Sequence, residues 1–166
     1  PIPVVSAFNN GPICAGENGE LSATFIAGAS YNWYSDASLT TLVSTTRTPV
    51  ISNMMASETY YVVATVNGCQ SLADSTTITV NPTPVAPAPT YSPLCQLDTL
   101  FLQANATGAI ASYNWTGPNG FTSHLANPVI PNAYTFNAGS YVVTVVDSFG
   151  CEAMSTVEVT IYPKPQ

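Results

Sequence analysis

Only 7% of the 166 residues are charged, against about 25% in typical soluble domains, and the formal net charge is −7. Since the chain has a single lysine and a single arginine, we expect neither nucleic acid nor an anionic membrane surface as a partner. Hydrophobic residues make up 46% of the chain, which is therefore predicted to fold despite its 14 prolines. No apolar run is long enough for membrane insertion, no signal peptide is evident, and the linker-like start predicts a piece of something longer.

Short strand patterns fill the first half of the chain. After an extended entry over residues 1–13, β-branched or alternating runs occupy residues 21–26, 31–34, 42–46 and 48–52. A longer run over residues 60–66 ends in Asn67-Gly68, a turn signal that predicts a hairpin with residues 75–80. Trp33, in the middle of its run, is the candidate centre of a core.

The second half repeats this order after residues 82–90, where four prolines predict a semi-rigid linker. The repeat distance is 81 between Cys14 and Cys95 (95 − 14) and 82 between Trp33 and Trp115 (115 − 33). Two domains are therefore expected, over residues 1–81 and 91–166. Because no stretch has helical periodicity, the sequence predicts an all-β chain of two β-sandwiches.

Several motifs recur in both halves. The first half carries Tyr31-Asn-Trp-Tyr34 and Asn67-Gly-Cys-Gln-Ser71, and the second carries Tyr113-Asn-Trp-Thr-Gly-Pro-Asn-Gly-Phe121 and Ala138-Gly-Ser-Tyr-Val-Val-Thr-Val145. Together they resemble the immunoglobulin-like and PKD-type repeat modules of secreted Bacteroidota surface proteins, which are strung into long adhesins. The resemblance implies two tandem immunoglobulin-like β-sandwich domains, joined by a proline-rich linker and exported to the cell surface.

Four cysteines, two per repeat in matching places, indicate disulfides and an oxidising, extracellular compartment. The sequence has no Cys-x-x-Cys pair and only one histidine, His124, so we expect no metal and no cofactor. Two pairings stay open. Cys14–Cys69 and Cys95–Cys151 would close within the domains, although an immunoglobulin-like strand order places each pair at opposite ends. Alternatively, Cys14–Cys151 would join the two domains, and Cys95 would meet Cys69 of a neighbouring copy.

The resemblance also implies two modification sites. Asp74-Ser75-Thr76 and Asp98-Thr99-Leu100 match the Asp-Ser/Thr-apolar pattern that this group of bacteria uses for O-glycosylation. Ser75 and Thr99 are therefore the candidate sugar acceptors.

No catalytic arrangement is visible, because His124 has no nucleophile at a recognisable spacing, and we expect no enzyme. The acidic turn over residues 17–20 has oxygens that suit Ca²⁺, but a solvated turn is the simpler interpretation.

We expect an extracellular structural building block, the repeat unit of a surface adhesin stalk or of a self-assembling filament. Its partners would be neighbouring copies of itself, flanking repeat domains or surface glycans. In a filament, residues 1–8 are the candidate edge strand donated to a neighbour. The alternative is a carbohydrate- or cell-surface-binding module, for which Tyr34, Phe121 and Tyr134 are the candidate aromatic residues.

Overall fold

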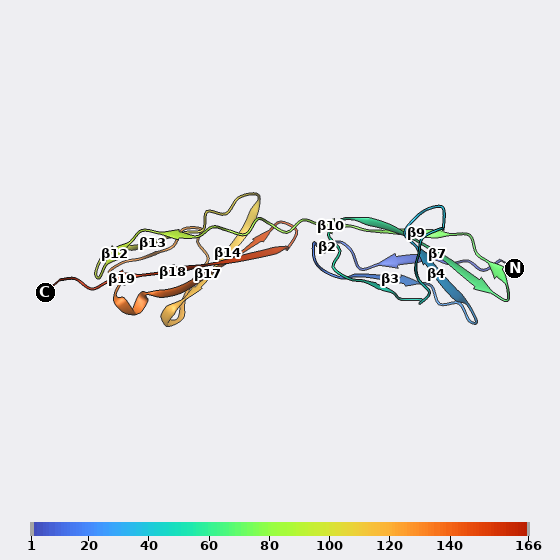
Figure 1. Cartoon of the computed structure of the whole chain (residues 1–166), viewed down its shortest axis with the longest axis horizontal. Coiled ribbons are helices and arrows are strands. Elements are labelled where there is room, and N and C mark those ends of the chain that lie inside the picture. The colour runs from blue at the N-terminus through green and yellow to red at the C-terminus, as the bar shows by residue number, and fades with distance from the viewer. Residues whose placement is uncertain (1, 166) are drawn as a thin grey trace. The chain divides into compact units, whose positions relative to one another are not determined.

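The computed structural model describes residues 2–165, which are almost entirely strand and loop. The chain divides into two compact units, residues 1–82 and residues 83–166, and each unit has its own hydrophobic core (Figure 1). The only helical segments among the described residues are two single turns of 3-10 helix. The all-β prediction is therefore confirmed.

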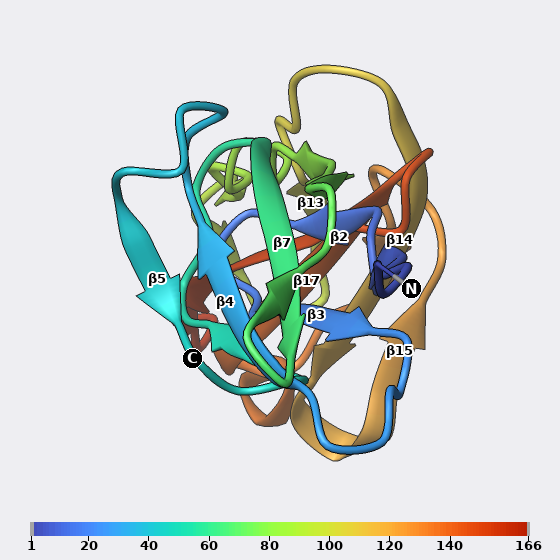
Figure 2. The same cartoon turned by 90° about the vertical axis from the view of Figure 1, so that its right-hand side faces the viewer.

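The first unit is built from two layers of short strands. Its main sheet has the order β5-β4-β7-β8, with β9 also paired to β7, and its second sheet has the order β1-β3-β6. Figure 2 shows β4 and β7 side by side, and their antiparallel register pairs Trp33 with Val62. A short parallel pair, β2 with β10, lies outside both sheets. The strands are β1 (Ala7–Asn9), β2 (Ile13–Cys14), β3 (Gly19–Ala23), β4 (Ser30–Tyr34), β5 (Leu42–Ser44), β6 (Val50–Ile51), β7 (Glu58–Val66), β8 (Cys69–Gln70), β9 (Asp74–Ile78) and β10 (Val80–Asn81).

The second unit repeats this layout. Its main sheet has the order β15-β14-β17-β18, its second sheet has the order β11-β13-β16, and β12 pairs in parallel with β19. The elements are β11 (Thr90–Tyr91), β12 (Leu94–Cys95), β13 (Leu100–Gln103), β14 (Ile110–Gly117), η1 (Pro118–Gly120), β15 (Phe121–Ser123), β16 (Val129–Ile130), η2 (Thr135–Asn137), β17 (Gly139–Asp147), β18 (Glu152–Val159) and β19 (Ile161–Tyr162).

Residues 82–90, predicted to be a linker, begin at the boundary between the units. The Asn105 side chain donates hydrogen bonds to the Ala88 carbonyl oxygen (3.0 Å) and to the Thr90 hydroxyl (2.9 Å). The last residues of the predicted linker are therefore fastened to the second unit.

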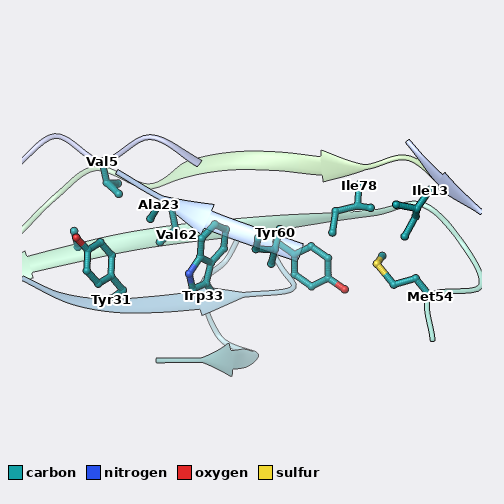
Figure 3. Close-up of a cluster of buried hydrophobic side chains, with 11 residues drawn as sticks. Val5, Ile13, Ala23, Tyr31, Trp33, Met54, Tyr60, Val62 and Ile78 are labelled. Carbon is teal, nitrogen blue, oxygen red and sulfur yellow. The ribbon is translucent and has the colours of Figure 1, made fainter. Parts of the chain in front are cut away.

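The core of the first unit is organised around Trp33, whose side chain is fully buried. Figure 3 shows its indole beside Val62 and Tyr60 of β7 and Ala23 of β3, so both sheets contribute to the contact. Burial alternates along β3, as expected for a strand with one face toward the core. Trp115 has the same role in the second unit, which confirms both tryptophans as core residues.

Each core also contains a buried tyrosine at the equivalent position of its central strand. Tyr60 and Tyr141 lie 81 residues apart (141 − 60) on β7 and β17, and both are almost completely buried. Burial raises the pKa of both phenols, because it disfavours the charged form. The Tyr60 hydroxyl donates to the Glu58 carboxylate, which raises its pKa further, and the Tyr141 hydroxyl donates to the Asn137 carbonyl oxygen (2.8 Å).

One surface loop is fixed by a carboxylate. Asp36, between β4 and β5, accepts hydrogen bonds from the backbone N–H groups of Thr40 (3.1 Å) and Thr41 (2.6 Å). These bonds favour the ionised form and lower the pKa of Asp36 to about 2.

Replacing Trp33 by alanine tests the importance of this core. Because the site is enclosed on all sides, we expect Trp33→Ala to reduce the free energy of unfolding of the first unit by about 3–5 kcal/mol. Urea denaturation followed by circular dichroism measures the change. Phe25→Ala is the control, since Phe25 is 78% exposed and its loss should change stability by less than about 0.5 kcal/mol. Equal unfolding midpoints for the two variants would contradict the assignment.

Candidate functional site

Each unit carries one cysteine at each end of its long axis. In the first unit, Ile78 pairs with Glu58 at the start of β7, and Cys14 pairs with Asn81 just beyond Ile78. Cys69 follows the opposite end of β7. A nine-residue strand is about 30 Å long, whereas the Cα atoms of a disulfide lie within about 7 Å of each other. Cys14 and Cys69 therefore lie too far apart to bond within the unit.

The second unit has the same arrangement. Val159 pairs with Gly139 at the start of β17, and Cys95 pairs with Tyr162 just beyond Val159. Cys151 follows the turn at the other end of β17. We call the end with Cys14 or Cys95 the tail of its unit, and the end with Cys69 or Cys151 the head.

The two tail cysteines sit in equivalent turns. The Cys14 N–H donates to the Glu17 carboxylate (2.8 Å), and the Glu17 N–H donates back to the Cys14 carbonyl oxygen (3.0 Å). Cys95 and Asp98 make the same two bonds, each 3.1 Å long. The acidic residue three positions after the cysteine thus closes the turn.

The two head cysteines follow tight turns of different construction. Asn67 (φ 49°) and Gly68 (φ 80°) both have left-handed backbone, as a two-residue hairpin turn of type I′ requires. In the second unit, the Asp147 carboxylate accepts hydrogen bonds from the N–H groups of Phe149 (2.8 Å) and Cys151 (3.0 Å). Backbone geometry fixes the first head turn, and a side chain fixes the second.

The four cysteines differ in bonding state. Cys14 and Cys151 are disulfide-bonded, whereas Cys69 and Cys95 carry free thiols. Cys69 is exposed and Cys95 is half-buried. The within-domain pairings Cys14–Cys69 and Cys95–Cys151 are thus not formed, for the reason of strand length given above. Disulfide bonding of Cys69 and Cys95 stays a prediction.

The two predicted glycan acceptors lie in different units and different settings. Ser75 is exposed on β9, and the preceding Asp74 carboxylate accepts a hydrogen bond from the Ala7 N–H (2.8 Å). Thr99 is half-buried in the short link between the Cys95 turn and β13. Only Ser75 therefore combines the motif with a clearly accessible hydroxyl.

The predicted sugar-binding aromatic residues differ in exposure and in their neighbours. Tyr34 is half-buried on β4, and Phe121 is half-buried with its ring edge-to-face against Tyr141 (5.4 Å between centroids). Tyr134 is 38% exposed and stacks on Phe136, with 5.4 Å between centroids and an angle of 7° between planes. Sequence analysis missed Phe136, because nothing in the pattern predicted the 3-10 turn that aligns the two rings.

The remaining candidate chemical groups are His124 and the acidic side chains. His124 is exposed, and its Nδ1 lies 3.2 Å from the Tyr113 carbonyl oxygen. Within these residues, no three His, Cys, Asp or Glu side chains are placed to hold a metal ion. None of the described helices has the length and apolar character needed to cross a membrane.

The predicted donor strand is engaged in its own unit. Val5 is buried in the first core, and Ala7 and Phe8 belong to β1, which pairs with β3. The residues expected to pair with a neighbouring copy thus pair within their own unit, and Pro1 lies outside the described residues. The preceding residues line an apolar groove of about 480 Å³ at the head of the unit, formed by residues 2–6 and 72–74.

Comparison with known proteins bears on the first unit most directly. Residues 1–82 match the family model described as "Ig-like domain CHU_C associated". The first unit is an Ig-like domain of this family. The match confirms the resemblance to Ig-like modules of Bacteroidota surface proteins. No curated protein matches the sequence.

Solved structures of low sequence identity match over nearly the whole chain. Murine CEACAM1b is 13% identical with a TM-score of 0.46, and the match covers 95% of this chain and 100% of that chain. Three N-terminal domains of the bacteriophage RB49 highly immunogenic outer capsid protein are 14% identical with a TM-score of 0.46, covering 95% of this chain and 58% of that chain.

Thiol labelling checks the bonding states. We expect iodoacetamide to modify Cys69 and Cys95 of the native monomer, with Cys69 reacting first because it is the more exposed. Cys14 and Cys151 should react only after reduction. Peptide mapping by mass spectrometry identifies the modified positions. Label on Cys14 or Cys151 before reduction would contradict the assignment.

Proposed function

We propose that the chain is an extracellular structural building block that carries tension and catalyses no reaction. In this proposal it comprises two tandem Ig-like β-sandwich domains with a proline-rich linker over residues 82–90, and it serves as the repeat unit of a surface adhesin stalk or a self-assembling filament. The observation that carries the proposal is the position of the cysteines, one at each end of each unit. Cross-links at the two ends of a domain connect it to neighbours along its axis.

The bonded cysteines support a covalent junction between the units. Since Cys69 and Cys95 are free and the chain has four cysteines, we infer that Cys14 and Cys151 are partners in one bond. The bond would connect the tail of the first unit to the head of the second. It would close a loop of 137 residues (151 − 14), which the chain-entropy model values at about 5 kcal/mol.

The strand arrangement suits a tensile role. Tension between head and tail runs along β7 and β17, the nine-residue central strands. Their hydrogen bonds to β4 and β9, or to β14 and β18, lie across the direction of pull. Many bonds must therefore be sheared together before a sheet separates. The low-charge surface, with a single lysine and a single arginine, suits close packing against neighbours or a coat of glycans.

Electron microscopy of native material tests the structural role. We expect the chain in thin fibres or stalks with a regular axial repeat, because units linked end to end extend in one direction. Immunogold labelling with an antibody against the recombinant chain identifies the fibres. Dispersed single molecules in native preparations would overturn the filament form of the proposal, and a hydrolytic or transferase activity dependent on His124 would overturn the non-enzymatic role.

Glycosylation of Ser75 is tested by peptide mass. In a digest of the protein isolated from its own cells, the peptide that contains Ser75 should exceed its sequence mass by a discrete glycan mass. Ser75→Ala should remove that increment, whereas Thr77→Ala, at an exposed position two residues along the same strand, should not. An unmodified native mass would remove Ser75 and Thr99 as acceptors without affecting the tensile role.

One observation favours the alternative, a carbohydrate-binding module. Phe136 is 61% exposed beside Tyr134, and the two rings are nearly parallel. Parallel exposed rings offer an apolar face on which a sugar ring can stack. Binding of soluble glycans that is lost in Phe136→Ala and kept in Phe149→Ala, an exposed residue of the second head turn, would support this alternative.

A further inference from the structure

We propose that Cys95 of one copy forms a disulfide with Cys69 of the next copy, so that the chain polymerises covalently from tail to head. This inference rests on the proposed function and gives it a partner, a second copy of the same chain, and a specific bond. Both thiols are free in the single chain, one at the head of the first unit and one at the tail of the second.

The internal repeat supplies the main argument. Cys95 is the counterpart of Cys14, because both lie in the same acid-closed turn and pair with the last strand of their unit. Cys69 is the counterpart of Cys151, because both follow the long central strand. The bonded pair thus consists of one tail and one head cysteine, and the two free thiols are the remaining tail and head. If the same tail-to-head bond also formed between two copies, every cysteine would be in a disulfide.

The tail of the second unit has an exposed apolar surface around Cys95. Tyr162 pairs with Cys95 and is 58% exposed, and Leu97 of the same turn is 44% exposed. The Leu97 N–H donates to the Ala133 carbonyl oxygen (2.7 Å), which brings the neighbouring Tyr134 to this end as well. Leu97 also has left-handed backbone (φ 75°), where the first unit has Gly16 (φ 90°). An exposed leucine in a conformation that favours glycine fits a contact surface better than a solvent-exposed turn.

The head of the first unit has a matching apolar groove. Leu72, three residues after Cys69, is 85% exposed, and Ile2 (68%) and Val4 (82%) face solvent across the same groove. Asp74 also lines the groove, and Lys164, the sole lysine, lies two residues beyond Tyr162 at the tail. Apolar contact and one opposite charge pair would therefore align the two thiols before they are oxidised.

Bond formation needs an oxidant, which we take to be a small or protein-borne disulfide. A thiolate at Cys69 attacks this disulfide and forms a mixed disulfide, releasing one thiol. The Cys95 thiolate of the neighbour then attacks the Cys69 sulfur and releases the second thiol. In total, Cys69 and Cys95 give up two protons and two electrons, one sulfur–sulfur bond forms, and one bond in the oxidant breaks.

Two singly blocked variants test the direction of linkage. Under oxidised glutathione, the wild type should give a ladder of bands spaced by 17.4 kDa on a non-reducing gel, which collapses to monomer on reduction. Cys69→Ser alone and Cys95→Ser alone should each stay monomeric. An equal mixture of the two should form dimers and nothing longer, because only one head and one tail thiol remain. Gln70→Ala and Ser92→Ala, at exposed positions near the two cysteines, should give the wild-type ladder.

Each outcome decides the proposal. A Cys69–Cys95 peptide in the digest of the mixed dimer would support it. Dimers of either variant alone would show symmetric linkage and overturn it, as would native Cys69 bonded to a cysteine outside the 166 residues. Fibres of wild type that persist under reductant and show no ladder under oxidant would overturn the cross-link and leave the proposed function intact. Absence of both fibres and ladder would count against both.

Discussion

The length of one straight strand is the constraint on which the rest of the structure depends. β7 and β17 each have nine residues, and each spans its unit from one end to the other. The turn that carries Cys14 or Cys95 lies at one end of this strand and the turn that carries Cys69 or Cys151 at the other, so the two turns are held apart. The position of each cysteine relative to these strands therefore decides which sulfur atoms can meet, and pairing inside a unit is ruled out before any detail of side-chain packing is considered.

The core that holds these strands in place depends on one large side chain in each unit. Each unit buries one tryptophan between its sheets, and both indole N–H groups lack a hydrogen-bond partner. An unsatisfied buried donor costs about 1–3 kcal/mol, so apolar packing of the ring outweighs a real penalty at both sites. The same solution in two units with different neighbouring residues indicates that the size and shape of the indole matter more than its polar atom.

Much of the fold could be predicted from the sequence, because its signals are local. The β-branched and aromatic run that ends in Asn67-Gly68 identified the central hairpin, and the spacing of the tryptophans identified the repeat. The strand expected over residues 21–26 instead ends at Ala23. There the Tyr31 hydroxyl donates to the Thr24 carbonyl oxygen (2.9 Å) and accepts from the Ile26 N–H (2.9 Å). A propensity pattern gives no sign that a hydroxyl of the next strand will form hydrogen bonds with this backbone.

The candidate site was less predictable, because it depends on contacts between distant segments. The sequence has cysteines in matching positions of the two repeats, but it left two pairings open. The strand register decides against pairing within a unit, because it places Cys14 and Cys69 at opposite ends of the central strand. Residues 1–8 were predicted to pair outside the unit, whereas Val5 fills a place in the first core that no local pattern reveals. The groove at residues 2–6 and 72–74 joins segments some seventy residues apart, and only the folded chain brings them together.

The parallel pairing of β2 with β10 has a consequence for how the molecule would move. Cys14 lies directly beside Asn81, the last strand residue before the polypeptide leaves the first unit. In the proposed arrangement, the disulfide and the main chain would thus be two adjacent covalent connections to the second unit. A single connection acts as a swivel, but two side by side resist rotation about the long axis. A fibre of such units would transmit torque as well as tension. Reduction of the disulfide would leave one covalent connection at each junction, about which the units could rotate.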